Sequence, residues 1–225
     1  MSDKAKITFG EKTCELPVIL GTEEERAFDI SKLRGDTGLI TLDIGFKNTG
    51  STQSKITFLD GEKGILRYRG YSIEDLAEKS TFLEVAHLLI HGELPSAKVF
   101  EDFSKDITTH TLIHEDMKRF YEAYPSKAHP MGILASMVSA MSTFYPGSQD
   151  PNREAESINR TIIRLLAKIP TISAWAYKNS VGPPVVYPRN SYSYVQNFVN
   201  MMFSLPTEDY EPDPLVVDAL DKLLI

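Results

Sequence analysis

The chain has 225 residues, of which 42% are hydrophobic and 24% charged, and its formal net charge at pH 7 is −7. This composition is typical of an ordinary globular protein, and the negative charge argues against a general nucleic-acid binder. No apolar run approaches the roughly 20 residues that span a bilayer, and the N-terminus has no signal-peptide or presequence character. Cys14 is the only cysteine, which excludes an intrachain disulfide and favours a cytoplasmic protein.

Residues 1–70 are predicted to form a β-rich N-terminal region. The segments Ala5–Phe9 and Cys14–Leu20 flank the turn Gly10-Glu11-Lys12, which indicates a hairpin. Leu39–Asp43 is predicted to be a further short strand. The polar, glycine-bearing segment Gly45–Ser54 is the best candidate for a boundary between compact parts of the chain.

The segment Ser54–Leu76 reads as a β-hairpin that leads into a helix. Two apolar runs flank the turn Asp60–Gly64, whose glycines can adopt a positive φ. Gly70 is expected to end the second strand. Ser72 is expected to cap the following helix, with Asp75 as its reciprocal partner three residues later.

From residue 71 to residue 225 the pattern becomes helical. Capping residues, prolines at first helical positions and apolar spacing predict helices over the following ranges: Thr81–His91, a helix capped by Ser96, Ile113–Tyr124, Pro130–Tyr145, Arg153–Lys168, Thr171–Ser180, Ser191–Ser204 and Leu215–Ile225. Asn152 is expected to open Arg153–Lys168, Pro170 to start Thr171–Ser180, and Pro206–Pro212 to form a surface loop. The last predicted helix has no C-terminal cap, so we expect the natural chain to continue.

Few residues indicate catalysis or metal binding. His87 and His91 are four residues apart, as are His110 and His114, and each pair could share one helical face. Neither pair has the glutamate of a zinc-protease motif, so structural or surface roles are expected. The chain also lacks a nucleophile elbow and a glycine-rich phosphate loop, so the residues alone predict no catalytic set.

Two helical patterns allow more than one interpretation. Small residues recur along Met131–Tyr145, which fits either a buried core helix or a close interface between subunits. Arg164 and Lys168 are four residues apart on an otherwise apolar helix. They fit either a salt-bridged surface or a clamp for a diphosphate.

Several strings of the sequence together resemble the citrate synthase family. They are the Ser54–Leu76 segment, Ala128-His129-Pro130-Met131 and Tyr187-Pro188-Arg189-Asn190, in this order along the chain. The resemblance runs over essentially the whole chain, corresponds to the N-terminal half of these enzymes, and looks closest to the hexameric bacterial branch that NADH regulates.

The resemblance implies a mainly α fold, namely the multi-helical large domain of citrate synthase with a small N-terminal β region. It implies condensation of acetyl-CoA with oxaloacetate to citrate and CoA, with no cofactor and no metal. The family's catalytic residues are expected beyond Ile225, so none is assigned here. The resemblance also implies a homodimer or hexamer with Met131–Tyr145 and Arg153–Ser180 in the subunit interface, and no nucleic-acid or membrane partner.

The family's regulatory nucleotide site corresponds, motif by motif, to five positions: His110, Tyr145, Arg164, Lys168 and Asn190. Other positions depart from the family pattern, namely Thr109, Leu112, Pro183 and Thr207. Because Thr109 replaces an expected arginine, one positive charge is lost and weak NADH binding is expected.

Two alternatives stay open at this point. One is 2-methylcitrate synthase, which uses propionyl-CoA on the same scaffold, because one methylene is discriminated by only about 1–3 kcal/mol. The other is a non-catalytic helical module for dimerisation or nucleotide sensing.

Overall fold

The structure, a computed structural model, describes residues 3–225. Internal contacts divide the chain into two compact units, Met1–Lys55 and Ile56–Ile225. The division follows directly after the polar segment Gly45–Ser54. The predicted division into a β-rich region, 1–70, and a helical region, 71–225, concerns the domains of the family. Compact units do not define those domains, so this division stays a prediction.

The first unit contains a three-stranded antiparallel sheet in the order β1-β2-β3, made of Lys4–Phe9, Lys12–Leu20 and Arg26–Phe28. The predicted hairpin is confirmed, with Gly10 at a φ of +62° in its turn. A short helix, α1 (Leu33–Thr37), follows and ends at Gly38, whose φ is +82°. The sequence reading missed β3, which is three residues long, and α1, which contains the helix-breaking Gly35.

The strand predicted at Leu39–Asp43 is wrong. Apolar and other residues alternate there as in a strand, but the segment pairs with no other strand in the described residues. Asp43 instead anchors a turn, since its carboxylate accepts hydrogen bonds from the Lys47 and Asn48 amides. An alternating pattern forms a strand only where an edge is available to pair with it.

The second unit opens with the predicted hairpin, β4 (Thr57–Asp60) and β5 (Ile65–Tyr68), to which β6 (Tyr71–Ser72) is added. Gly70, at a φ of +93°, ends β5 as expected. Ser72 then caps α2 (Ile73–Lys79) by accepting the Asp75 amide and donating to its carboxylate. The predicted reciprocal cap is therefore confirmed.

The helices of this unit confirm the mainly α prediction. They are α3 (Phe82–His91), α4 (Ala97–Thr109), α5 (Lys118–Ala123), α6 (Pro130–Met141), α7 (Ala155–Val181), α8 (Tyr194–Phe203) and α9 (Pro214–Leu224), with short 3₁₀ turns η1 (Glu115–Met117), η2 (Ser142–Phe144) and η3 (Pro146–Gln149). The spacing Thr81-Phe82-Leu83-Glu84 predicts a capping box at the start of α3, and Thr81 and Glu84 form it. His114 caps η1, so the helix predicted from Ile113 begins only at Lys118, after this 3₁₀ turn. Ser193 caps α8, so this helix begins at Tyr194 rather than at the predicted Ser191.

The long helix α7 corrects the prediction of two separate helices around residue 170. Its 27 residues run without interruption through Pro170, and Glu154 rather than Asn152 precedes its first turn. Proline removes one amide donor and normally breaks a helix. Here the Leu166 carbonyl, which the amide of residue 170 would satisfy in a regular helix, accepts a 2.9 Å hydrogen bond from the Tyr194 hydroxyl instead.

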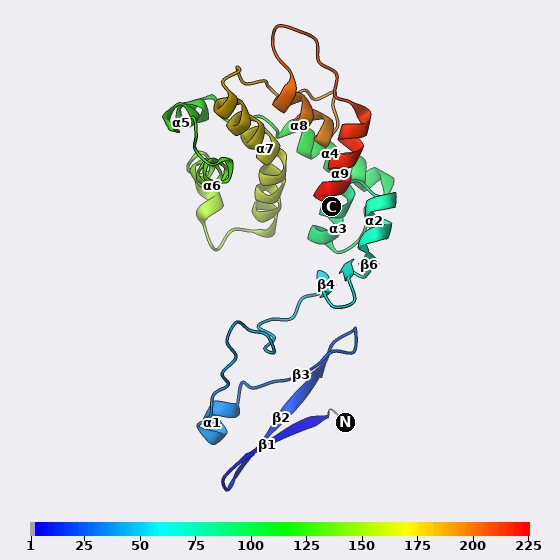
Figure 1. Ribbon diagram of the computed structural model, residues 1–225, viewed down its shortest axis with the longest axis vertical. Helices are drawn as coiled ribbons and strands as arrows, with labels where there is room; N and C mark the ends of the chain where they lie inside the picture. Colours follow the sequence, from blue (N-terminus) through cyan, green and yellow to red (C-terminus); the bar gives the residue numbers. More distant parts are fainter. Residues whose placement is uncertain (1–2) are drawn as a thin grey trace. The chain divides into compact units, whose positions relative to one another are not determined.

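The core of the second unit is organised around α7, which lies between α6 and α8 (Figure 1). Ile172 and Trp175 pack into one buried cluster with α6 residues such as Met137. Ile163 and Ala167 pack into a second cluster with α3 and α4. No helix in residues 3–225 is both long and apolar enough to cross a membrane.

Candidate functional site

The side chains of greatest chemical interest in the second unit gather where η2 meets α7. Tyr145 directly follows η2, and its ring lies under the Arg164 guanidinium at 4.5 Å from centroid to carbon. The ammonium of Lys168, one turn later on α7, lies 5.9 Å from the same ring. The structure therefore brings together three of the five residues predicted for a nucleotide site, and cation–π attraction holds Arg164 over the ring.

A cavity of about 140 Å³ lies beside this group. Its lining is partly apolar and partly hydroxylic: Val138, Met141, Ser142, Tyr145, Ser148, Thr161, Arg164 and Leu165. Outside this lining, the Arg153 guanidinium donates to the carbonyl of the lining residue Ser148, and its Nε is buried without a hydrogen-bond partner. An arginine beside three hydroxyl groups is chemically suited to an anion.

Lys168 does not face this cavity as a free cation. Its side chain is only 4% exposed, and its ammonium donates to the carbonyls of His110, at 2.7 Å, and Leu112. Burial lowers the pKa of Lys168 to about 8, and the nearby Arg164 charge adds to this effect. Lys168 therefore ties α7 to the end of α4, while Arg164 is the α7 cation that lines the cavity.

The remaining two predicted residues do not line the cavity. His110 contributes its backbone carbonyl to Lys168, and its Nδ1 lies 2.7 Å from the Asp106 carbonyl at the end of α4. Asn190 is exposed in the segment between α7 and α8. The hydroxyl residues Ser142, Ser148 and Thr161 were missed in the sequence because no spacing distinguishes them from surface residues.

The two histidine pairs differ in the structure. The imidazoles of His87 and His91 share one face of α3 with centroids 4.4 Å apart, and both rings meet the edge of Phe103. His110 and His114 do not share a helical face, because α4 ends at Thr109 and His114 caps η1. Across residues 3–225 no three His, Cys, Asp or Glu side chains gather in a way that could hold a metal ion.

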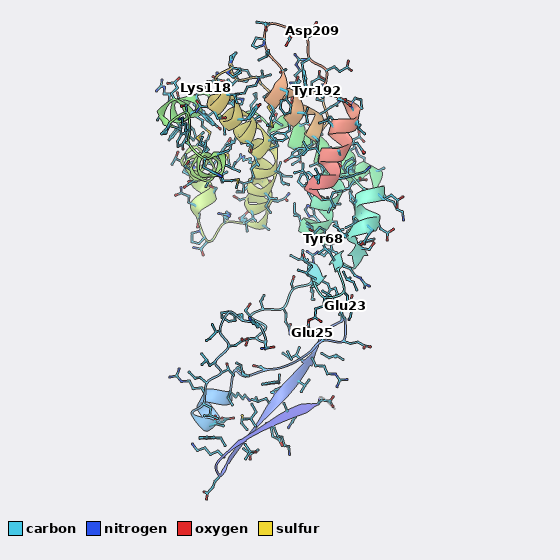
Figure 2. The ribbon with its side chains drawn as sticks, in the orientation of Figure 1. Glu23, Glu25, Tyr68, Lys118, Tyr192 and Asp209 are labelled. Atoms are coloured by element: carbon cyan, nitrogen blue, oxygen red, sulfur yellow. The ribbon has the colours of Figure 1, made fainter. Side chains whose placement is uncertain are left out.

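A second charged and aromatic group surrounds Lys118, which is labelled in Figure 2. Its ammonium lies over the rings of Tyr187, at 4.6 Å, and Trp175, at 5.4 Å. Glu115 pairs with Lys118 at 2.7 Å and accepts the Tyr187 hydroxyl at 2.7 Å. These bonds lower the pKa of Glu115 and raise that of Lys118, so the pair stays charged and joins α5 to α7.

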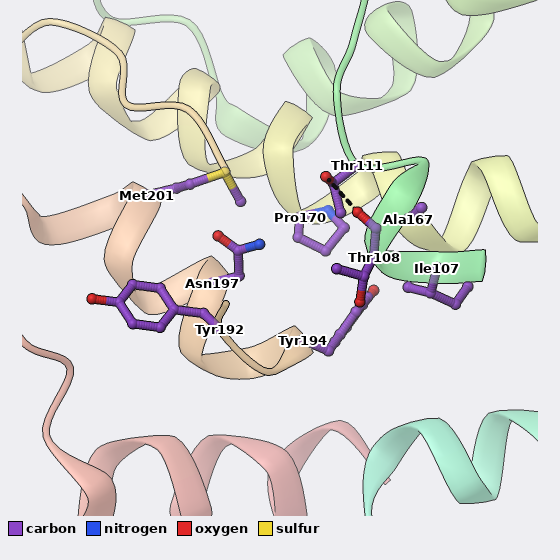
Figure 3. A pocket seen from close by; sticks show the side chains of 9 residues that line it. All are labelled: Ile107, Thr108, Thr111, Ala167, Pro170, Tyr192, Tyr194, Asn197 and Met201. Carbon is purple, nitrogen blue, oxygen red and sulfur yellow. Dashed lines mark hydrogen bonds between the residues drawn. The ribbon is translucent and has the colours of Figure 1, made fainter. Parts of the chain in front are cut away.

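A smaller cavity lies between α4, α7 and α8, and Figure 3 shows its lining. Its volume of about 10 Å³ holds at most one water molecule. The lining residues are Ile107, Thr108, Thr111, Ala167, Pro170, Tyr192, Tyr194, Asn197 and Met201, with Thr111 donating to the Thr108 carbonyl. This cavity is a packing defect beside Pro170 and is too small for a ligand.

Comparison with known proteins decides the family. The model for "Citrate synthase, C-terminal domain" matches residues 45–225. The chain belongs to the citrate synthase family. Citrate synthase 1 of Mycobacterium tuberculosis (strain ATCC 25618 / H37Rv) is 47% identical over 223 residues, covering 99% of this chain and 52% of that protein. Citrate synthase of Corynebacterium glutamicum is 46% identical over 224 residues, covering 100% of this chain and 51% of that protein.

Solved structures of citrate synthases share the fold. The enzyme from Pyrobaculum aerophilum matches with a TM-score of 0.69 and 34% identity, over 80% of this chain and 45% of that one. Citrate synthase from Thermoplasma acidophilum, solved with carboxymethyl coenzyme A and oxaloacetate, matches with a TM-score of 0.71 and 21% identity. The match covers 81% of this chain and 46% of that one. The mainly helical citrate synthase-like fold is therefore confirmed, and the chain spans about half the length of the curated relatives it matches.

Proposed function

We propose that this chain forms the N-terminal half of a citrate synthase, which condenses acetyl-CoA with oxaloacetate to citrate and CoA. The observation that carries the proposal is identity of 47% to a mycobacterial citrate synthase over 99% of the chain. The carboxymethyl coenzyme A and oxaloacetate bound to the Thermoplasma enzyme support the same two substrates.

The histidines of this chain support a structural rather than a catalytic role. His114 and His129 cap η1 and α6 through their Nδ1 atoms, and His87 Nδ1 lies 3.0 Å from the Glu93 carbonyl. The condensation needs a general base to form the enol of acetyl-CoA and electrostatic stabilisation of that enol. We assign these groups to the part of the relatives' length that this chain does not span.

The test is a CoA-thiol release assay with acetyl-CoA and oxaloacetate, on the 225-residue chain and on a full-length protein that contains it. We expect turnover by the full-length protein and none by the chain alone. Propionyl-CoA in the same assay decides between citrate synthase and 2-methylcitrate synthase, and an equal or higher kcat/KM with propionyl-CoA would overturn the assignment. No turnover with either thioester would leave the non-catalytic module as the function.

We further propose that the cavity beside Tyr145 and Arg164 is the regulatory nucleotide site of the bacterial, NADH-responsive branch. An arginine over an aromatic ring and three hydroxyl groups in the lining support a ligand with a phosphate and a planar group. Because Thr109 adds no cation and Lys168 is engaged by two carbonyls, we expect weak binding.

We also propose a homo-oligomer, dimer or hexamer, that forms in the cytoplasm through α6 and α7. Gly132, Ala135 and Ser139 are small and exposed at helical spacing on α6. Met131 is 62% exposed, and Ile158 and Val181 of α7 are 42% and 52% exposed. Small residues let helices approach closely, and exposed apolar side chains favour their burial in an interface.

A further inference from the structure

Two histidines of the second unit form a pair that the proposed reaction does not use. His87 and His91 lie four positions apart on α3, and their ring centroids are 4.4 Å apart. Residues with this spacing share one face of a helix, so the two imidazoles lie on the same side of α3. The fold thus brings two nitrogen ligands of the same kind together.

The ring of Phe103 on α4 holds both imidazoles in position. It makes T-shaped contacts with His87, at 5.4 Å between centroids, and with His91, at 6.3 Å. Phe103 is itself buried in the cluster that joins α3, α4 and α7. Because the core fixes this ring, the imidazoles lose less freedom on binding a ligand than two unsupported surface side chains would.

A backbone carbonyl determines which nitrogen of His87 carries the proton. His87 Nδ1 lies 3.0 Å from the Glu93 carbonyl oxygen. Since that oxygen can only accept, Nδ1 donates and Nε2 keeps its lone pair. Histidines that bind metals are oriented in the same way, by a hydrogen bond from the other ring nitrogen. His87 is buried and His91 is exposed at the end of α3, so an ion can reach the pair from the His91 side.

The distance between the two rings suits neighbouring ligands of one ion. A nitrogen-to-metal distance of about 2.0–2.1 Å places each ring centroid about 3.2 Å from the metal. Two such centroids are then about 4.5 Å apart when the ligands are at right angles, and about 5.2 Å apart at the tetrahedral angle. The observed 4.4 Å matches the right angle. Right angles are typical of tetragonal Cu²⁺ and Ni²⁺ sites, whereas structural Zn²⁺ sites are tetrahedral.

We propose that His87 and His91 together bind one divalent ion of the tetragonal class, Ni²⁺ or Cu²⁺, independently of the citrate synthase reaction. The two imidazoles supply adjacent positions, and water completes the coordination. No third His, Cys, Asp or Glu side chain joins the pair in the part of the chain that the structure describes. The ion therefore keeps open positions and exchanges with solvent.

An ion bound by both histidines closes a ring across the last turn of α3. The end of a helix opens readily, because its last carbonyls have no partner within the helix. The pair exists only while this turn is folded, so the ion stabilises the folded turn by mass action. The local consequence is slower exchange of the backbone amides at the end of α3.

The test is hydrogen–deuterium exchange of a full-length protein that contains this chain, with mass spectrometry of the peptide that covers α3. At a NiCl₂ concentration about ten times its Kd, exchange at the end of α3 should slow about tenfold, and EDTA should reverse the effect. MgCl₂ should have no effect, because Mg²⁺ prefers oxygen ligands. No protection by Ni²⁺, or equal protection by Mg²⁺, would overturn the proposal.

A variant of the exposed histidine separates ligation from other effects of the ion. His91→Gln removes one of the two ligands, so the Ni²⁺ concentration for half-maximal protection should rise roughly tenfold or more. The matched control is His114→Gln, because His110 and His114 have the same spacing but do not share a helical face. This control should leave the protection of α3 unchanged. Equal protection in His91→Gln and the unmodified protein, or an equal loss in the control, would show that the pair does not bind the ion.

Discussion

The Tyr194 hydroxyl donates a 2.9 Å hydrogen bond to the Leu166 carbonyl, the acceptor that Pro170 leaves without its helical partner. Residue 170 lies four positions after Leu166, where a regular helix would supply an amide. Burial raises the pKa of Tyr194 far above its ordinary range, so the hydroxyl remains a donor. A side chain of α8 thus completes the hydrogen bonding of α7.

Replacing Tyr194 by phenylalanine should therefore destabilise the protein by about 1–2 kcal/mol, since it leaves a partly buried carbonyl without a donor. The ring contact with Phe82, at 5.3 Å between centroids, is retained in this variant. In a Pro170→Ala background the residue-170 amide bonds to Leu166, so Tyr194→Phe should cost less. Urea unfolding of the four chains measures this coupling, and equal costs in both backgrounds would contradict it.

Lys168 should make the stability of the protein depend on pH between about 8 and 10.5. Its pKa is about 8 in the folded chain, against an ordinary value of 10.5. In this window the unfolded chain binds more protons than the folded one, so the free energy of unfolding rises as the pH rises. Below pH 8 both states are protonated and the cost of burying the charge is fully present.

Lys168→Met removes this dependence. The stability of the unmodified chain relative to this variant should increase by about 1–3 kcal/mol from pH 7.5 to 10.5. Urea midpoints at three pH values measure the change, with the exposed Lys105→Met of α4 as control. Parallel pH profiles for the unmodified chain and Lys168→Met would show that the lysine is not buried in its charged form.

Arg164 should contribute more to nucleotide binding than Lys168 does. Arg164→Gln should weaken NADH binding roughly tenfold to a hundredfold, because it removes the charge-assisted contact in the cavity. Lys168→Met should have the smaller effect, since its ammonium is engaged by the His110 and Leu112 carbonyls. Titration at low salt followed by NADH fluorescence measures both, with Arg160→Gln as the control on the exposed side of α7. A larger effect at Lys168 would show that the ligand displaces those carbonyls.

Ala135→Arg should disrupt self-association through α6. The residue is exposed and small, so an arginine there blocks close approach of a second helix. Sedimentation velocity at tens of micromolar should show a shift toward a lower mass. The control is Ala123→Arg at the exposed end of α5, which should leave the mass unchanged. Identical sedimentation of both variants would remove α6 from the interface.

Local signals determined much of the fold without tertiary information. The Ser72–Asp75 and Thr81–Glu84 caps, the Gly10 and Gly70 positions, and the start of α9 at Pro214 all appear as the sequence predicts. Each of these depends on atoms within a few residues of one another, so the local sequence contains the whole interaction. The family resemblance likewise followed from short strings in their order along the chain.

Tertiary contacts decided the rest. Pro170 reads as a helix start, yet α7 continues through it, and the Leu166 carbonyl that Pro170 leaves without an amide donor is satisfied by the Tyr194 hydroxyl on α8, 28 residues after Leu166. Leu39–Asp43 reads as a strand, and only the lack of a pairing edge among the described residues keeps it irregular. Arg164 and Lys168 look equivalent one turn apart, yet burial against the carbonyls after α4 separates their roles. Hydrogen bonds and burial between distant segments depend on packing, which local residue patterns do not encode.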